Sequence, residues 1–119
     1  DGSLSAGAPY MTMEMPLLPD QSGGAKPGER PATLPLYATI SGGDGMTTES
    51  TGRWFVTTTL GVQVFDQAGR LSGILAKPSP EAKVVSCEFA GKGHDVLFIA
   101  AGDKVMSRKL KVKGFFGSK

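Results

Sequence analysis

The sequence contains little of what marks several large classes of protein. Cys87 is its only cysteine, so no internal disulfide can form and the chain gives no disulfide evidence for an oxidising compartment. No apolar run approaches the roughly 20 residues of a membrane helix, and we expect no membrane partner. The formal net charge of +2 is too small to indicate a nucleic-acid partner.

Helix-forming runs are also scarce, whereas turn-forming residues are abundant. The 119 residues include 17 glycines and 8 prolines, and 39% of the residues are hydrophobic. A chain of this size can bury the core of one modest domain, and its composition favours an all-β fold rich in turns. The chain opens with "DGSLSAG" rather than a methionine or a signal-like segment, so we expect a mature product or a fragment, of unknown localisation.

The N-terminal third divides into two parts. From Tyr10 to Met15, three methionines alternate with polar residues, which predicts a strand with a methionine face in the core. A methionine-rich binding surface is the alternative. Residues 17–43 are rich in proline and other turn formers, which indicates a long loop. Its end, "LYATI" (36–40), could form a short strand.

From residue 44 onward the pattern predicts short antiparallel strands. The first four are expected over 46–49, 53–59, 62–65 and 71–76, and three more over 83–91, 95–103 and 104–112. The second set repeats the first, with Phe55 matching Phe98 and Val62 matching Val105, at a period of about 43 residues. A β-meander that recurs at this period is typical of β-propeller blades. The second copy lacks a fourth strand.

The C-terminal end is basic. Between Lys109 and Lys113, lysines alternate with Leu110 and Val112, which predicts an outer strand whose lysines discourage edge pairing. A phosphate-binding or membrane-surface patch is the alternative interpretation.

A set of motifs in this order resembles a known family. Asp44-Gly45-Met46 is followed by "TGRWFVTT", "GVQVFD", "GRLSGIL", "VSCEFAG" and "LFIAAGDKV". Together they are similar to the C-terminal part of the senescence-marker-protein/gluconolactonase family, also called regucalcin-like proteins. The resemblance covers nearly all of residues 44–112, and "DGSLSAGAPY" is similar to an outer strand of the preceding blade. Residues 17–43 have no counterpart.

The resemblance implies part of a six-bladed β-propeller. Residues 1–16 would supply the outer strand of a preceding blade, and residues 17–43 a long loop. Residues 44–77 would form a complete blade, and residues 83–113 an incomplete last blade. In the family, the N-terminus of the full chain provides the missing outer strand.

The resemblance also implies a metal-dependent enzyme that hydrolyses sugar lactones. The family holds a divalent metal with a Glu, an Asn and an Asp from different blades, and the Asp falls on Asp44 here, as metal ligand and general base. The Glu and Asn lie upstream of anything in this chain. Ca²⁺, Mg²⁺ and Zn²⁺ all accept carboxylate ligands, so the metal stays open. The residues alone allow a plainer interpretation, because Gly-Asp-Gly is common turn chemistry.

Other candidates for chemistry are weaker. His94, the only histidine, lies in "GKGHD" and is expected to be an exposed turn residue. Cys87 is expected to pack as a small apolar residue. Trp54 and Phe55 are expected in core and inter-blade packing. "GKG" at 91–93 lacks the spacing of a phosphate loop, and no Gly-x-Ser-x-Gly elbow occurs.

Two functions therefore stay open. The chain is either part of a metal-dependent lactonase that uses Asp44, or a propeller-type binding or structural module without a complete active site. One ligand from one blade cannot hold a catalytic metal, and an open pair of blades exposes apolar faces and a sheet edge. We therefore expect the chain to need the remaining blades or to self-associate. Three copies would complete a six-bladed ring and bring three Asp44 carboxylates together.

Overall fold

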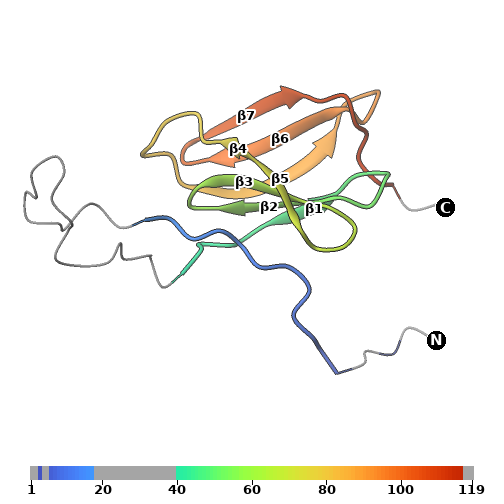
Figure 1. Ribbon diagram of the computed structural model, residues 1–119. Helices are drawn as coiled ribbons and strands as arrows, with labels where there is room; N and C mark the ends of the chain where they lie inside the picture. The colour runs from blue at the N-terminus through green and yellow to red at the C-terminus, as the bar shows by residue number, and fades with distance from the viewer. Residues whose placement is uncertain (1–2, 4–5, 18–39, 117–119) are drawn as a thin grey trace, which may run out of the picture.

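The computed structural model describes residues 3, 6–17 and 40–116. Seven strands between Met46 and Lys109 form two antiparallel sheets (Figure 1). This part of the chain contains strands and no helix, and hence no helix that could cross a membrane. In each sheet, consecutive strands are neighbours, so both are meanders. The first sheet contains β1 (Met46–Thr48), β2 (Trp54–Thr58), β3 (Gly61–Phe65) and β4 (Leu71–Ala76), and the second contains β5 (Val84–Ala90), β6 (Val96–Ala101) and β7 (Lys104–Lys109).

The all-β fold and the four-plus-three division of strands confirm the expectation from the sequence. The observed strands differ from the expected ranges mainly at their ends, where the chain turns. Of the expected strand at 36–40, all but Ile40 lies outside the described residues, and Ile40 itself is exposed and outside any strand. Most of the long loop expected at 17–43 also lies outside the described residues.

The β1–β2 and β3–β4 hairpins close with the same sequence pattern: an acid, two residues, glycine and arginine. In the second hairpin, Asp66 Oδ1 accepts hydrogen bonds from the backbone N–H groups of Ala68 and Arg70, both at 2.9 Å. Gly69 has φ 77°, a conformation that glycine adopts without steric cost. The Arg70 side chain also donates to Asp66 Oδ2 at 2.8 Å. The pattern therefore specifies a tight turn through local hydrogen bonds.

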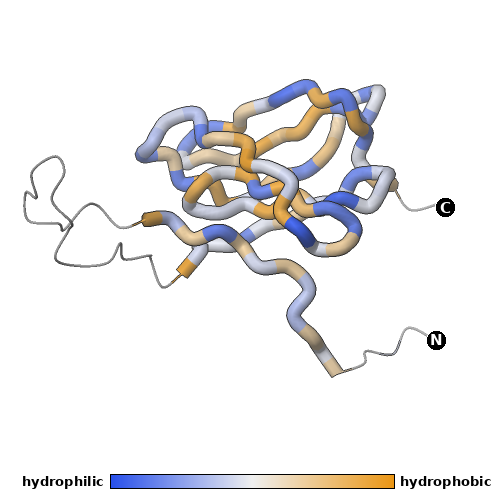
Figure 2. Tube along the Cα trace, in the orientation of Figure 1, coloured by the Kyte–Doolittle hydropathy of each residue, from blue (hydrophilic) through white to orange (hydrophobic). Residues whose placement is uncertain are grey.

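The main apolar core lies between the two sheets. Phe55 of β2 meets Phe89 of β5 edge to face, with ring centroids 5.1 Å apart. Such pairs stabilise a core beyond the area that they bury. Figure 2 shows hydrophobic segments along the strands of both sheets. The buried members of this core are Phe55, Val62, Val64, Val84, Cys87, Phe89, Leu97 and Ala101.

The N-terminal segment lies along the first sheet. Gln63 of β3 is fully buried, and its side chain forms two hydrogen bonds with the backbone of Glu14: Oε1 accepts from N–H at 2.8 Å, and Nε2 donates to O at 2.9 Å. The strand expected over Tyr10–Met15 is wrong, because residues 6–16 form no strand and only Leu17 makes an isolated bridge. An outer strand needs a neighbouring strand, and none of the described residues supplies one here. The expected alternation holds, with the methionines half-buried and the polar residues exposed.

The C-terminal segment turns back to the first sheet. The expectation of an outer strand through Lys113 is wrong, since β7 ends at Lys109. Leu110 then donates its N–H to Asp95 O at 2.8 Å. Further on, Gly114 forms an isolated bridge with Glu49. Leu110 and Val112 pack against the core, which explains their alternation with lysines without a strand.

The outward face of the second sheet is partly apolar. Phe98 is 37% exposed and Val105 is 71% exposed. Their matching residues in the first sheet, Phe55 and Val62, are 3% and 1% exposed because the second sheet covers them. Within the described residues, nothing covers the second sheet in the same way, so the repeat is structurally open at this face.

Candidate functional site

Asp44 stands immediately before β1 on a backbone that is held from two sides. Gly45 N–H donates to Val85 O at 3.0 Å and to the Thr57 hydroxyl oxygen at 2.9 Å. The Thr57 hydroxyl in turn donates to Gly45 O at 3.0 Å, and Asp44 N–H donates to Thr57 O at 3.3 Å. Thr57 is fully buried. These bonds fix the backbone that carries the Asp44 carboxylate.

Gly45 is required for the close approach of the two sheets. A Cβ added to it would lie 2.8 Å from Ser86 Cα and 3.0 Å from Val85 O, which are backbone atoms and cannot move cheaply. The first strands of both sheets, β1 and β5, therefore lie side by side just beyond Asp44. Of the three glycines around Asp44, only Gly42 has a positive φ, at 66°.

The Asp44 residue is exposed and lines a cleft of about 180 Å³. The opposite wall comes from the connection between β4 and β5. This connection carries Lys77, Glu81 and Lys83, which line the same cleft. The Lys77 ammonium group donates to Pro80 O, which ties the connection to itself. The cleft is smaller than an ordinary ligand site of 300–1,000 Å³, so these residues form at most one wall of a substrate pocket.

The described residues do not complete a metal site. No group of three or more histidine, cysteine, aspartate or glutamate residues in this part of the chain is placed to hold a metal ion. Asp44 and Glu81 are the carboxylates at the cleft, and two lysines line it as well. A divalent cation bound beside Asp44 would therefore need ligands from outside the described residues.

The weaker candidates lie apart from this cleft. Cys87 is buried, and its thiol donates to Phe55 O at 3.5 Å. Burial, followed by the nearby charge of Glu88, raises the pKa of the thiol to about 11, so the thiolate is scarce at neutral pH. His94 is exposed in its turn, with φ 53°, and its ring lies 3.7 Å from that of Phe116. Both expectations for these residues are confirmed.

Sequence reasoning found Asp44 but missed its surroundings. Lys77, Glu81 and Lys83 could not be found from the sequence, because their place at the cleft depends on how the connection between β4 and β5 folds. The role of Thr57 could not be seen either, since a buried threonine in a strand is ordinary.

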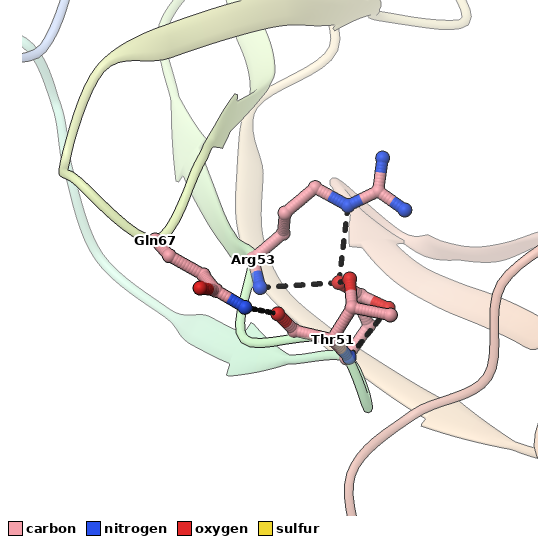
Figure 3. Close-up of polar contacts among 4 residues, drawn as sticks. Thr51, Arg53 and Gln67 are labelled. Carbon is pink, nitrogen blue, oxygen red and sulfur yellow. Dashed lines mark hydrogen bonds and ion pairs between the residues drawn. The ribbon is translucent and has the colours of Figure 1, made fainter.

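A second polar cluster surrounds Glu49, which is 1% exposed. Figure 3 labels Thr51 and Arg53, which bind its carboxylate. Glu49 Oε1 accepts hydrogen bonds from Arg53 N at 3.1 Å and Arg53 Nε at 3.0 Å, and Oε2 accepts from Thr51 N at 3.1 Å. The Thr51 hydroxyl also donates to the carboxylate. Burial opposes ionisation most strongly, but the hydrogen bonds from Thr51 and Arg53 together outweigh it and lower the pKa of Glu49.

We expect Glu49→Gln to lower the free energy of unfolding by about 2 kcal/mol at pH 7, since hydrogen bonds to a charged group are lost. Because the folded state has the lower pKa, the carboxylate stabilises the fold above the ordinary value of 4.5, and this contribution disappears as the pH falls below it. The difference between wild type and variant should therefore shrink in acid. Urea titrations at pH 7 and pH 3.5 measure it.

Asp66→Asn is the matched control for this prediction, because Asp66 occupies the same turn pattern. Its side chain is 29% exposed, against 0% for that of Glu49. Water can replace lost hydrogen bonds at the exposed turn, so we expect a smaller loss than for Glu49→Gln. Equal losses of unfolding free energy in the two variants would show that the burial of Glu49 does not strengthen its hydrogen bonds.

Comparison with family models, with curated proteins and with solved structures gives no match for this chain. The resemblance to the gluconolactonase family thus depends on the motifs quoted above.

Proposed function

We propose that this chain is part of a metal-dependent lactonase of the gluconolactonase type, in which Asp44 is a metal ligand and the general base. The observation that carries the proposal is the Asp44 carboxylate, exposed at a cleft on a backbone fixed by Thr57 and Val85. Rigid placement of a reacting group is what catalysis by proton transfer requires.

The arrangement of the sheets supports a propeller with Asp44 near its axis. Each sheet is a meander that begins with a strand at its edge, and these first strands lie side by side where Gly45 meets Val85. In a propeller, the first strand of each blade lies innermost, so Asp44 would lie at the mouth of the channel. The remaining metal ligands, a Glu and an Asn in the family, would come from other blades.

The step assigned to this chain is proton transfer. A water molecule attacks the carbonyl carbon of the lactone, and Asp44 accepts its proton as the new C–O bond forms. The ring C–O bond then breaks, and the leaving oxygen takes up a proton to give the open hydroxy acid. General-base help of this kind contributes about 10²–10⁴-fold to a rate.

The proposal is tested by hydrolysis of glucono-1,5-lactone, measured with this chain and with a longer form that includes the residues upstream of it. We expect the longer form to be active, to lose activity with EDTA and to regain it with a divalent metal. The 119-residue chain alone should be inactive unless it assembles. Activity of the longer form that is indifferent to EDTA would contradict a metal-dependent lactonase.

The second candidate is a non-catalytic binding or structural module. The observation that favours it is the incomplete metal site, since Asp44 has no set of partner ligands among the described residues. The exposed Phe98 and Val105 are compatible with both candidates, because further blades or other copies of the chain could cover them. A longer form that binds a sugar or protein regardless of divalent metal, and hydrolyses no lactone, would favour the module.

A further inference from the structure

A groove of about 350 Å³ lies away from Asp44, between β4 and the C-terminal segment. The β4 side is formed by four consecutive residues, 72–75, and the other side by Leu110, Lys111 and Val112. Consecutive strand residues point to opposite faces of a sheet. A groove that touches four in a row therefore reaches the edge of β4. Phe55 of β2 and Val64 of β3 line its inner part, on the face of the first sheet that carries the core.

The hollow in this groove is caused by a missing side chain. Phe55, Val64 and Gly73 are direct cross-strand partners on β2, β3 and β4, so they form one row across the sheet. Phe55 and Val64 fill their places with buried apolar groups, whereas Gly73 leaves its place empty. A Cβ added to Gly73 would have no heavy atom within 4 Å. The space beside Gly73, at the end of this row, is therefore open to an apolar side chain of a ligand.

The charges at the groove have one sign. Arg53 and Lys111 line it, and no carboxylate does. Arg53 uses its Nε atom to bind Glu49, while its two terminal nitrogens extend away from the bonded oxygen (Figure 3). The groove is therefore complementary to a ligand with both an apolar group and an anionic group.

The free edge of β4 indicates the form of this ligand. Within the described residues, β4 pairs with β3 only, and its other edge forms no backbone hydrogen bond. An extended peptide can add to such an edge as a further strand, with main-chain hydrogen bonds for affinity and side-chain pockets for specificity.

We propose that this groove binds an extended, acidic segment of a partner protein, which pairs with β4. One apolar side chain of the segment enters the hollow beside Gly73, and a carboxylate meets Arg53 and Lys111. This site is independent of the lactonase proposed above, because it shares no residue with the Asp44 cleft.

The test uses the 119-residue chain and a fluorescein-labelled hexapeptide in which valine alternates with aspartate. Fluorescence anisotropy should show saturable binding that weakens as salt is raised. Gly73→Leu should weaken binding at least about tenfold by filling the hollow, and Gly73→Val should have an intermediate effect. Lys111→Gln should weaken it about threefold, as expected for one exposed ion pair. Lys104→Gln, which removes a lysine outside the groove, should change nothing.

Circular dichroism and urea unfolding of the Gly73 variants check that the sheet is intact, as the open space at Gly73 leads us to expect. With intact folding, unchanged binding by Gly73→Leu overturns the proposal. Equal binding of a peptide that alternates valine with lysine overturns the charge argument. Saturable binding of decanoate in the groove without any peptide binding would assign the site to small carboxylates instead.

Discussion

Asp44→Asn is expected to lower kcat for lactone hydrolysis by about 10²–10⁴-fold in the proposed lactonase, because asparagine cannot accept the proton of the attacking water. The substitution keeps the size of the side chain and leaves the backbone bonds of Thr57 and Val85 to residues 44 and 45 in place. The fold should therefore survive. Initial rates with glucono-1,5-lactone, over a range of substrate and metal concentrations, give kcat and KM for both proteins.

The two roles proposed for Asp44 are separable by measuring bound metal alongside the rate. If Asp44 is the base but not a metal ligand, the variant keeps its metal content while its kcat falls. If Asp44 is also a metal ligand, the substitution lowers the affinity for the metal as well, so part of the lost rate returns at high metal concentration. Asp103→Asn is the control, since Asp103 is exposed in the β6–β7 turn and lines the neighbouring cleft rather than that of Asp44. A fully active Asp44→Asn enzyme would remove Asp44 from the mechanism.

The strands could be predicted from the sequence because their signals are local. A high density of aromatic and β-branched residues located β2, and the acid-x-x-Gly-Arg pattern closes two hairpins through hydrogen bonds within five residues. Period-2 alternation is not sufficient by itself. It also occurs over Tyr10–Met15, which belongs to no strand, and over Lys109–Lys113, where the strand ends at Lys109. Leu110 and Val112 pack against the core beyond the end of β7.

The candidate site was less accessible to this reasoning. Asp44 could be singled out because glycines surround it and because its motif resembles a family. The charged residues that face Asp44 could not be singled out, because Lys77, Glu81 and Lys83 reach the cleft on the irregular connection between β4 and β5. No sequence period describes such a path. The groove beside Gly73 was missed for a related reason: a glycine in a strand indicates a hollow only when its cross-strand neighbours are known.

Phe55→Ala is expected to lower the free energy of unfolding by about 3–5 kcal/mol, the usual cost of truncating a buried phenylalanine. Phe55 is 3% exposed and packs edge to face on Phe89, so its loss leaves a cavity between the two sheets. With a urea m-value of about 1–3 kcal/mol/M, the midpoint of unfolding should fall by roughly 2 M. Phe55→Leu should lose less, because leucine refills much of the space.

Phe98→Ala is the matched substitution, because Phe98 holds the equivalent place in the repeat but is 37% exposed. We expect it to cost less than about 1 kcal/mol, since little buried area is lost. Its effect should appear in association instead. The outward face with Phe98 and Val105 is partly apolar, so the wild-type chain should self-associate at high concentration. Phe98→Ala should shift it toward monomer in sedimentation or light scattering.

The contrast between these two phenylalanines tests the open repeat directly. If the second sheet were a finished outer surface, Phe98→Ala would change neither stability nor association, and the wild-type chain would be a well-dispersed monomer. If a further sheet covers this face in a longer form, Phe98→Ala should lower the free energy of unfolding of that form as much as Phe55→Ala does in this chain. The cost of this one substitution, measured in the short and the long form, therefore reports whether another sheet packs on β5–β7.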